Sequence, residues 1–295
     1  MKAALLPDRG VVKVTGNEAR KLLNGLVTSD LGKVAPARPA FAALLTPQGK
    51  IITDFIIVDG AGVAGDDFHL DCPRPLAPAL VERLKFYKLR AKVAIEDISD
   101  AVAVMAFWND GAVAAAATHY PDPRLPALGT RCISSSPPAQ AAAACGAELV
   151  DATAYEAHRI ALGVPAGGLD FIYGDAFPHE ADMDQLAGVD FDKGCFVGQE
   201  VVSRMQHRGT ARTRVVPVRY DGFAPEAGLP VTAGEKPVGT FGSAAAGHGL
   251  ALLRLDRTDD ALAAGVPLTA GGIALTPQKP AWARFQFPGD AKAAE

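Results

Sequence analysis

The C-terminal third of the chain restricts the fold most, because from Thr213 onward short β segments alternate with glycine and proline. A short strand cannot bury its apolar face alone, so strands of this kind pack together in one closed sheet. We therefore predict a small antiparallel β-barrel over residues 210–289, with a frayed tail at 290–295. The segments expected as strands include Arg214–Tyr220, Lys236–Ser243, Gly249–Leu255 and Trp282–Phe287.

The N-terminal two thirds mixes helix and strand patterns. Leucines 76, 80 and 84 recur at every fourth position, which predicts a helix over about 75–87. Two apolar runs, 40–47 and 50–58, flank Pro47-Gln48-Gly49 and predict a hairpin. Further strands are expected at 10–15, 90–97 and 101–107, and further helices at 17–24 (capped by Asn17) and 151–162 (with a capping box of Thr153 and Glu156).

Composition limits the class of protein. The 295 residues are 49% hydrophobic, which is enough for a large core and for one large compact unit or two to three domains. The net charge of −4 gives no hint of a nucleic-acid or membrane partner. Residues 1–6 are too short an apolar run for a secretory signal, and no apolar run reaches the ~20 residues of a membrane span. We expect a soluble cytoplasmic protein with no membrane partner.

The stretch from Lys193 to Glu200 is the strongest functional signal. It places Cys195 in a turn between two glycines, ahead of a helix expected from Val197 or Gly198. The helix N-terminus and the lysine two residues earlier both favour a thiolate over a thiol, which predicts a reactive cysteine. The alternative is an inert cysteine buried in a glycine-rich loop. The other cysteines, Cys72, Cys132 and Cys145, are expected mostly as small buried hydrophobes.

Several chemistries lack their sequence patterns. None of the cysteines forms a Cys-x-x-Cys pair, so we expect no zinc or iron–sulfur site built by this chain alone and no permanently bound metal. Serines lack a Gly-x-Ser-x-Gly context, and the glycines at 239–249 do not form a dinucleotide fingerprint. The histidines also lack metal-ligand spacing; they are His69, His119, His158, His179, His207 and His248.

A basic stripe follows the cysteine turn. Residues 201–220 contain no acid, although the chain as a whole is acidic. Such a stripe could hold the glutamate tail of a folate, an RNA backbone or the acidic surface of a partner protein, or it could be a solvated face. Its members are Arg204, Arg208, Arg212, Arg214 and Arg219, together with His207.

The octapeptide Lys193-Gly194-Cys195-Phe196-Val197-Gly198-Gln199-Glu200, with Arg204 and Arg208-Gly209 after it, resembles the hallmark of the YgfZ family. These folate-binding proteins are related to the mitochondrial iron–sulfur assembly factor Iba57 and, more distantly, to the aminomethyltransferase (T-protein) of the glycine cleavage system. The resemblance covers most of the chain. Shorter segments match in the family's order: Asp8–Val12, Val14–Gly16, Leu22–Asp30, Thr46–Phe55, Arg159–Pro165 and Phe177–Glu180.

The resemblance implies an α+β fold: a ring of three subdomains of the aminomethyltransferase type around tetrahydrofolate. Residues 1–209 would be the folate-binding region, with two α+β subdomains and a loop near 134–138, and the barrel would be the third subdomain. Glu180 matches the glutamate that binds the pterin edge through two charge-assisted hydrogen bonds. Asp54 falls where relatives carry a carboxylate near the reactive nitrogens of folate. Many of them have two adjacent acids there, whereas this chain has Thr53-Asp54.

The resemblance also assigns the remaining roles. Cys195 and Lys193 are the expected catalytic residues, Arg204 and Gln199 are further folate contacts, and the rest of the motif is Gly194, Phe196, Val197, Gly198 and Glu200. The expected function is that of a folate-binding accessory protein that assembles or repairs iron–sulfur enzymes, with tetrahydrofolate as cofactor and iron–sulfur client proteins as partners. One alternative is a tetrahydrofolate-dependent aminomethyl or one-carbon transferase; whether the chain turns over a substrate is left open. Another is a module that binds tRNA or a tRNA-modifying enzyme through the stripe.

Overall fold

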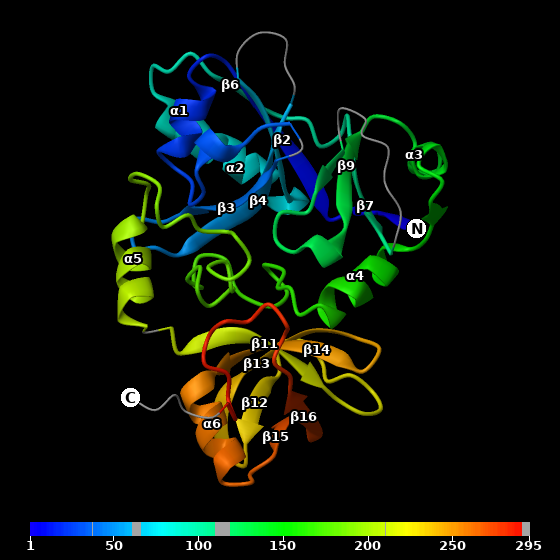
Figure 1. Ribbon diagram of the computed structural model, residues 1–295, viewed down its shortest axis with the longest axis vertical. Helices are drawn as coiled ribbons and strands as arrows, with labels where there is room; N and C mark the ends of the chain where they lie inside the picture. The colour runs from blue at the N-terminus through cyan, green and yellow to red at the C-terminus, as the bar shows by residue number, and fades with distance from the viewer. Residues whose placement is uncertain (37, 61–65, 110–118, 210, 291–295) are drawn as a thin grey trace. The chain divides into compact units, whose positions relative to one another are not determined.

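The computed structural model describes residues 1–36, 38–60, 66–109, 119–209 and 211–290 (Figure 1). The chain divides into two compact units. Unit 1 is Met1–Tyr155 with Leu186–Gln199, and unit 2 is Glu156–Gln185 with Glu200–Glu295. Of the tail expected to fray, residues 291–295 lie outside the described residues.

The first sheet of unit 1 contains the predicted hairpin, which is confirmed. Its strand order is β3-β4-β5-β2-β6, and each strand is antiparallel to its neighbours. Leu23, Phe55 and Leu84 are fully buried in the core between this sheet and its helices. The elements are β2 Arg9–Thr15, β3 Ala40–Leu45, β4 Ile51–Asp59, β5 Asp67–Pro73, β6 Ala94–Asp97, α1 Ala19–Asn24, α2 Ala77–Lys88 and the 3-10 turns Leu31–Lys33 and Arg74–Leu76.

The second sheet of unit 1 has the order β10-β1-β7-β9-β8, and its β10–β1 pair is parallel. The loop expected near 134–138 is shorter than predicted, because a helix already begins at Pro138. The elements are β1 Lys2–Leu5, β7 Ala103–Trp108, β8 His119–Pro121, β9 Thr130–Ser134, β10 Glu148–Leu149, α3 Pro138–Ala144 and the 3-10 turn Pro126–Leu128. The helix α4 follows at Ala152–Ala161.

A buried ionic cluster joins the two sheets of unit 1. Asp71 of β5 accepts hydrogen bonds from Arg9 of β2 (2.6 Å) and Arg131 of β9 (2.8 Å). Tyr120 of β8 donates its hydroxyl proton to the same carboxylate (3.0 Å). Burial alone would raise the pKa of Asp71, but the two arginines hold it below its ordinary value. Fully buried charges are tolerated only when paired in this way, so the cluster fixes how the two sheets meet.

Unit 2 contains the predicted barrel, which is confirmed as a closed sheet of order β11-β14-β13-β12-β15-β16 (Figure 1). Pairing of β11 with β16 closes it. The expected strand at Trp282–Phe287 is wrong; its Phe287 is buried against the barrel core instead. The elements are β11 Thr213–Arg219, β12 Pro230–Ala233, β13 Lys236–Ala245, β14 His248–Arg254, α6 Leu255–Ala263, β15 Leu268–Ala270 and β16 Ile273–Pro277.

Two predicted helix caps are wrong. The helix α1 begins at Ala19, after Glu18 rather than Asn17, and Glu18 accepts a hydrogen bond from the backbone of Lys92 (2.8 Å). At α4, Asp151 caps the backbone N–H of Thr153 (2.9 Å), so the predicted capping box of Thr153 is displaced. Strand β6 covers the second half of the predicted 90–97 segment. Within the part of the chain that the structure describes, no helix has the length and apolarity to cross a membrane.

Candidate functional site

The cysteine turn belongs to unit 1, where the segment before it lies along residues 28–29. The backbone N–H of Asp190 donates to the carbonyl of Thr28 (2.9 Å), and the Thr28 hydroxyl donates to the carbonyl of Gly188 (2.6 Å). Asp190 also forms an ion pair with Lys33. Cys195 at the end of this segment is a free thiol exposed to solvent. The alternative of a buried residue is therefore wrong for Cys195, and its reactivity stays a prediction.

The other cysteines differ from it in exposure. Cys72 and Cys132 are buried and Cys145 is half-buried, so the expectation of mostly buried hydrophobes is confirmed. Burial raises the pKa of the Cys72 thiol to about 12, which leaves it protonated and poorly nucleophilic at neutral pH. Exposure therefore separates Cys195 from the two buried thiols.

Lys193 anchors the turn to the backbone of residues 24–29. The residue is 8% exposed, and its ammonium donates to the backbone carbonyls of Asn24 (2.8 Å), Val27 (2.6 Å) and Ser29 (3.0 Å). An ammonium has three N–H groups, so each of them has a carbonyl partner. Burial lowers the pKa of Lys193 to about 8, and Asp30 is the main group that opposes this shift. The lysine thus fixes the backbone of the turn through contacts within unit 1.

The two glycines of the motif have different roles. Gly198 has φ +82, and a Cβ atom there would lie 2.6 Å from the carbonyl oxygen of Thr46 and 3.1 Å from the Cα of Gly49. Only glycine fits this close approach to the tip of the β3–β4 hairpin. A Cβ on Gly194 would meet no atom of the described residues within 4 Å. Gly198 is therefore the glycine that the packing of the turn requires.

The remaining motif residues complete the turn. Phe196 is 8% exposed, and its ring centroid lies 5.2 Å from the Lys193 nitrogen, while Val197 packs against the core of unit 1. The helix α5 spans Gln199–Arg208, so it begins one or two residues later than predicted. Its first N–H, on Gln199, donates to the carbonyl of Phe196 (3.2 Å). Glu200 and Arg204 form the expected i,i+4 ion pair (2.6 Å).

Glu180 belongs to unit 2 and has a fixed orientation. Its carboxylate accepts a hydrogen bond from the backbone N–H of Phe177 (2.8 Å), and its carbonyl accepts one from Val215 of β11 (3.0 Å). The side chain is half-buried. The turn 177–180 is thus attached to the barrel and presents an oriented carboxylate.

Asp54 lies on β4 of unit 1 and is 8% exposed. Its charge, together with that of Asp71, raises the pKa of Arg9 against the effect of burial. Asp54 therefore interacts electrostatically with the buried ionic cluster. Glu180 and Asp54 belong to different units.

The predicted basic stripe is exposed to solvent except at Arg214. Arg214 is 4% exposed and binds the carboxylates of Asp182 (3.0 Å) and Asp184 (2.8 Å) inside unit 2. Arg204 is paired with Glu200 on α5, and Arg219 is hydrogen-bonded to His248. The sequence window between 201 and 220 holds no acid, but the partners come from outside that window. The stripe hypothesis is therefore wrong for Arg214.

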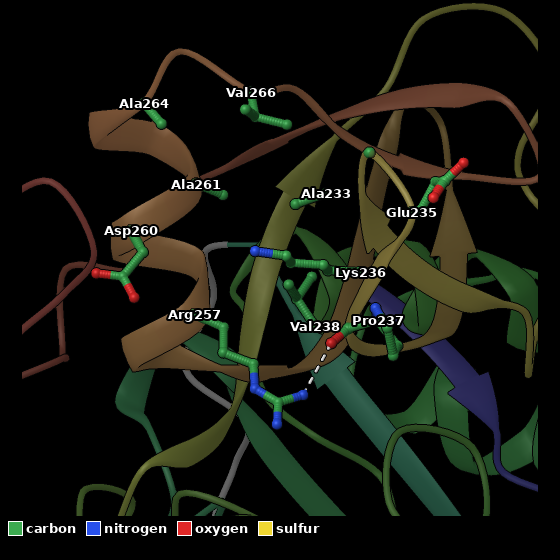
Figure 2. A pocket seen from close by; sticks show the side chains of 11 residues that line it. Ala233, Glu235, Lys236, Pro237, Val238, Arg257, Asp260, Ala261, Ala264 and Val266 are labelled. Carbon is green, nitrogen blue, oxygen red and sulfur yellow. Dashed lines mark hydrogen bonds between the residues drawn. The ribbon is translucent and has the colours of Figure 1, made fainter.

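Each unit carries a large cavity among its described residues. The one on unit 1 has ≈630 Å³ and is lined by the segment before the cysteine turn, including Asp190 and Phe191, with Asp30 and Lys33. No sequence motif marks it, because its walls come from three separate segments of the chain. The one on unit 2 has ≈800 Å³ and lies between α6 and the β12–β13 hairpin (Figure 2). Its rim carries charges of both signs, namely Glu235, Lys236, Arg257 and Asp260, so charge selects no ligand for it.

Metal-ligating side chains do not cluster in the described ranges: no group of three or more His, Cys, Asp or Glu could hold a metal ion there. Cys195 is the exposed one of the four free cysteines and lies on a fixed turn. Such a thiol can act as a nucleophile, as a redox group or as one ligand to a metal centre that another protein supplies.

Comparison with known proteins adds the family context. Residues 212–285 match the family described as CAF17, C-terminal beta-barrel domain. The chain is 37% identical over 231 residues to the mitochondrial iron–sulfur cluster assembly factor IBA57 homolog of Mycosarcoma maydis, covering 74% of this chain and 57% of that protein. It is 32% identical over 274 residues to the human mitochondrial iron–sulfur cluster assembly factor IBA57, covering 84% of this chain and 76% of the human protein.

A solved structure shares the fold. The aminomethyltransferase T of the glycine cleavage system from Bartonella henselae superimposes with a TM-score of 0.71 over 97% of this chain and 87% of that chain, at 15% identity. This likeness confirms the predicted aminomethyltransferase-type fold. The chain spans little more than half of the Mycosarcoma maydis protein. The prediction of a cytoplasmic protein is wrong by these comparisons, because the matched IBA57 relatives are mitochondrial proteins.

Proposed function

This chain belongs to the family of the iron–sulfur cluster assembly factors of the IBA57 type, and on that premise we propose that it acts in the assembly or repair of iron–sulfur enzymes through Cys195. The observation that carries the proposal is the exposed thiol at a turn whose backbone is fixed on both sides. Lys193 anchors the residue two positions before it, and Gly198 packs against the β3–β4 hairpin three positions after it.

The turn suits brief contact with a cluster that a client protein holds. Iron–sulfur clusters are bound by cysteine thiolates, commonly four of them. Cys195 offers one exposed sulfur, so it can serve as one ligand to a client cluster, which is cargo here. A fixed backbone lowers the conformational entropy lost when the sulfur meets that cluster. Partners of the chain are therefore iron–sulfur client or assembly proteins.

Replacing the thiol tests this function. Cys195→Ser should fold like the wild type, because the side chain is exposed, but should fail to restore the activity of a cluster-dependent enzyme in cells that lack their own assembly factor of this family. Cys145→Ser is the matched control, since Cys145 is another free and partly exposed cysteine, and it should restore activity fully. Restoration by Cys195→Ser to the wild-type level would show that the thiol is not used.

A reduced folate is the second part of the proposal, and Glu180 supports it. The backbone N–H of Phe177 holds the half-buried Glu180 carboxylate in one orientation, which is what recognition of a pterin amidine edge requires. Asp54 is less suited to contact a folate, because it is only 8% exposed and interacts electrostatically with Arg9. When bound, a reduced folate would supply a carrier for one-carbon units.

Folate binding is tested by titration with tetrahydrofolate and with folinic acid. Glu180→Gln keeps an acceptor for the Phe177 N–H but removes the charge, and should weaken binding at least ten-fold, since charge-assisted bonds are about twice as strong as neutral ones. Glu226→Gln, at an exposed site of unit 2, should bind like the wild type. Equal affinity of the wild type and Glu180→Gln would remove Glu180 from the site but leave the role of Cys195 standing.

A further inference from the structure

The C-terminal end of α2 carries apolar side chains on the solvent side of unit 1. Phe86 is 73% exposed and Leu89 is 85% exposed. The inward face of the same helix is already complete, because Leu80, Val81 and Leu84 are buried in the core. The two exposed side chains therefore add nothing to that core. Together with the cations around them they form a surface that we name the α2 tip, defined as Arg83, Lys85, Phe86, Lys88, Leu89, Arg90 and Lys92.

Positive charge is concentrated at the α2 tip. Its five cations are Arg83, Lys85, Lys88, Arg90 and Lys92, and the sequence contains no acid between Arg83 and Ile95. Two acids meet the tip: Glu82 forms an exposed ion pair with Lys85 (3.2 Å), and the exposed Glu18 accepts a hydrogen bond from the backbone N–H of Lys92 (2.8 Å). The chain as a whole has a net charge of −4, so this local excess of positive charge is opposite in sign to the average.

The backbone holds Leu89 outward in a conformation that favours glycine. The helix ends at Lys88, and Leu89 follows with φ +48 and ψ −108. A side chain at positive φ is strained, and glycine is the usual residue after a helix end of this kind. Phe86 rests edge-on against Tyr87, with ring centroids 5.6 Å apart, and Tyr87 packs on the core. The folding of unit 1 does not explain why a strained leucine and a phenylalanine are both exposed here. Backbone strain of this kind is commonly retained for function.

We propose that the α2 tip docks on the surface of an anionic phospholipid bilayer. Clusters of four to eight lysines and arginines on an amphipathic helix attract anionic headgroups, and exposed Phe and Leu side chains enter the boundary between headgroups and acyl chains. Lysine is depleted in protein–protein interfaces, which argues against a protein partner. Nucleic-acid bases stack on aromatic rings, whereas Leu89, the more exposed of the two apolar residues, has an aliphatic side chain. The net charge gave no hint of a membrane partner. It is an average over the whole chain and does not reveal this local cluster of cations.

The proposal is independent of the function of Cys195 and is tested on the full chain by vesicle flotation. Vesicles of phosphatidylcholine mixed with phosphatidylserine are compared with vesicles of phosphatidylcholine alone, each at low and at high salt. The chain should float with the anionic vesicles at low salt and should largely dissociate at high salt, because screening weakens surface electrostatics. No flotation with the anionic vesicles would overturn the proposal.

Variants assign the binding to the α2 tip. Leu89→Gly relieves the positive φ, so it keeps the fold while it removes the side chain, and it should weaken binding several-fold. Arg90→Glu removes one cation and adds one anion and should weaken binding by more than ten-fold, at roughly five-fold for each charge. The matched controls on unit 2 are Phe223→Ser, at a residue that is 92% exposed, and Lys236→Glu, and both should bind like the wild type.

Two results would contradict the assignment. Equal weakening by Arg90→Glu and Lys236→Glu would mean that net charge, and not the α2 tip, sets the binding. Displacement of the vesicles by a single-stranded RNA, with tighter binding to that RNA than to the anionic vesicles and loss of it in Arg90→Glu, would identify the tip as a nucleic-acid site and overturn the lipid proposal.

Discussion

The cysteine turn of unit 1 and the Glu180 turn of unit 2 are each held by one buried cation, but the two cations have different partners. Lys193 donates to three backbone carbonyls, which are neutral. Arg214 donates to two carboxylates, those of Asp182 and Asp184, and to the carbonyl of His179. Its guanidinium also stacks over the ring of Phe285, 4.4 Å from the centroid.

The two cations differ in how far their hydrogen-bond partners neutralise their charge. The charge of Arg214 is neutralised at contact distance, and against the effect of burial it holds the pKa of Asp184 below its ordinary value. Lys193 has no carboxylate among its hydrogen-bond partners, and Asp30 and Asp190 act on it at longer range. The lysine therefore fixes the backbone of the cysteine turn through neutral partners. The arginine serves the packing of unit 2 instead.

Removal of Arg214 should have the largest effect on folding. Arg214→Met leaves two buried carboxylates without their cation, and burial already raises the pKa of Asp182 well above its ordinary value. We expect a loss of about 3–5 kcal/mol in the free energy of unfolding, measured by urea denaturation. Arg208→Met, at an exposed position of α5, should change it by less than about 0.5 kcal/mol. Equal losses in both variants would show that the buried contacts of Arg214 contribute no more than an exposed arginine does.

Removal of Lys193 should cost less, because its partners are uncharged. Lys193→Met leaves the carbonyls of Asn24, Val27 and Ser29 without this donor, and we expect a loss of about 1–3 kcal/mol in the free energy of unfolding. Lys33→Met is the control: that side chain is 61% exposed, and its pair with Asp190 should contribute no more than about 1 kcal/mol. A loss in Lys193→Met as large as that in Arg214→Met would contradict this prediction. It would show that the three hydrogen bonds of the lysine stabilise the fold as much as the ion pairs of the arginine.

Local patterns in the sequence predicted the elements whose contacts are short in range. The β3–β4 hairpin, the four-residue repeat of α2 and the succession of short barrel strands all depend on neighbouring residues. Barrel closure by β11 and β16 and the burial of Phe287 depend on residues far apart in sequence, and the second was missed. The cap of α4 was misplaced by two residues, because Thr153 donates both its backbone N–H and its hydroxyl to Asp151 and does not itself cap the helix.

The site shows the same division. The glycine-bounded turn and the exposure of Cys195 follow from residues within the octapeptide. The partners of Lys193 lie more than 160 positions earlier, and those of Arg214 lie about 30 positions earlier, so neither set could be read from the motif. The strained Leu89 and the exposed Phe86 were also missed, because a helical pattern shows which residues can face inward but not how the helix ends.

The most direct test of the account is the alkylation of the four cysteines in the native protein by iodoacetamide, followed by mass spectrometry with time. We predict that Cys195 is modified first and that Cys145 follows more slowly. Cys72 and Cys132 should react only after unfolding, since reactivity needs exposure and thiolate character. Protection of Cys195 in the folded chain, or its modification at the same rate as the buried Cys72, would contradict the claim that a fixed turn presents a working thiol.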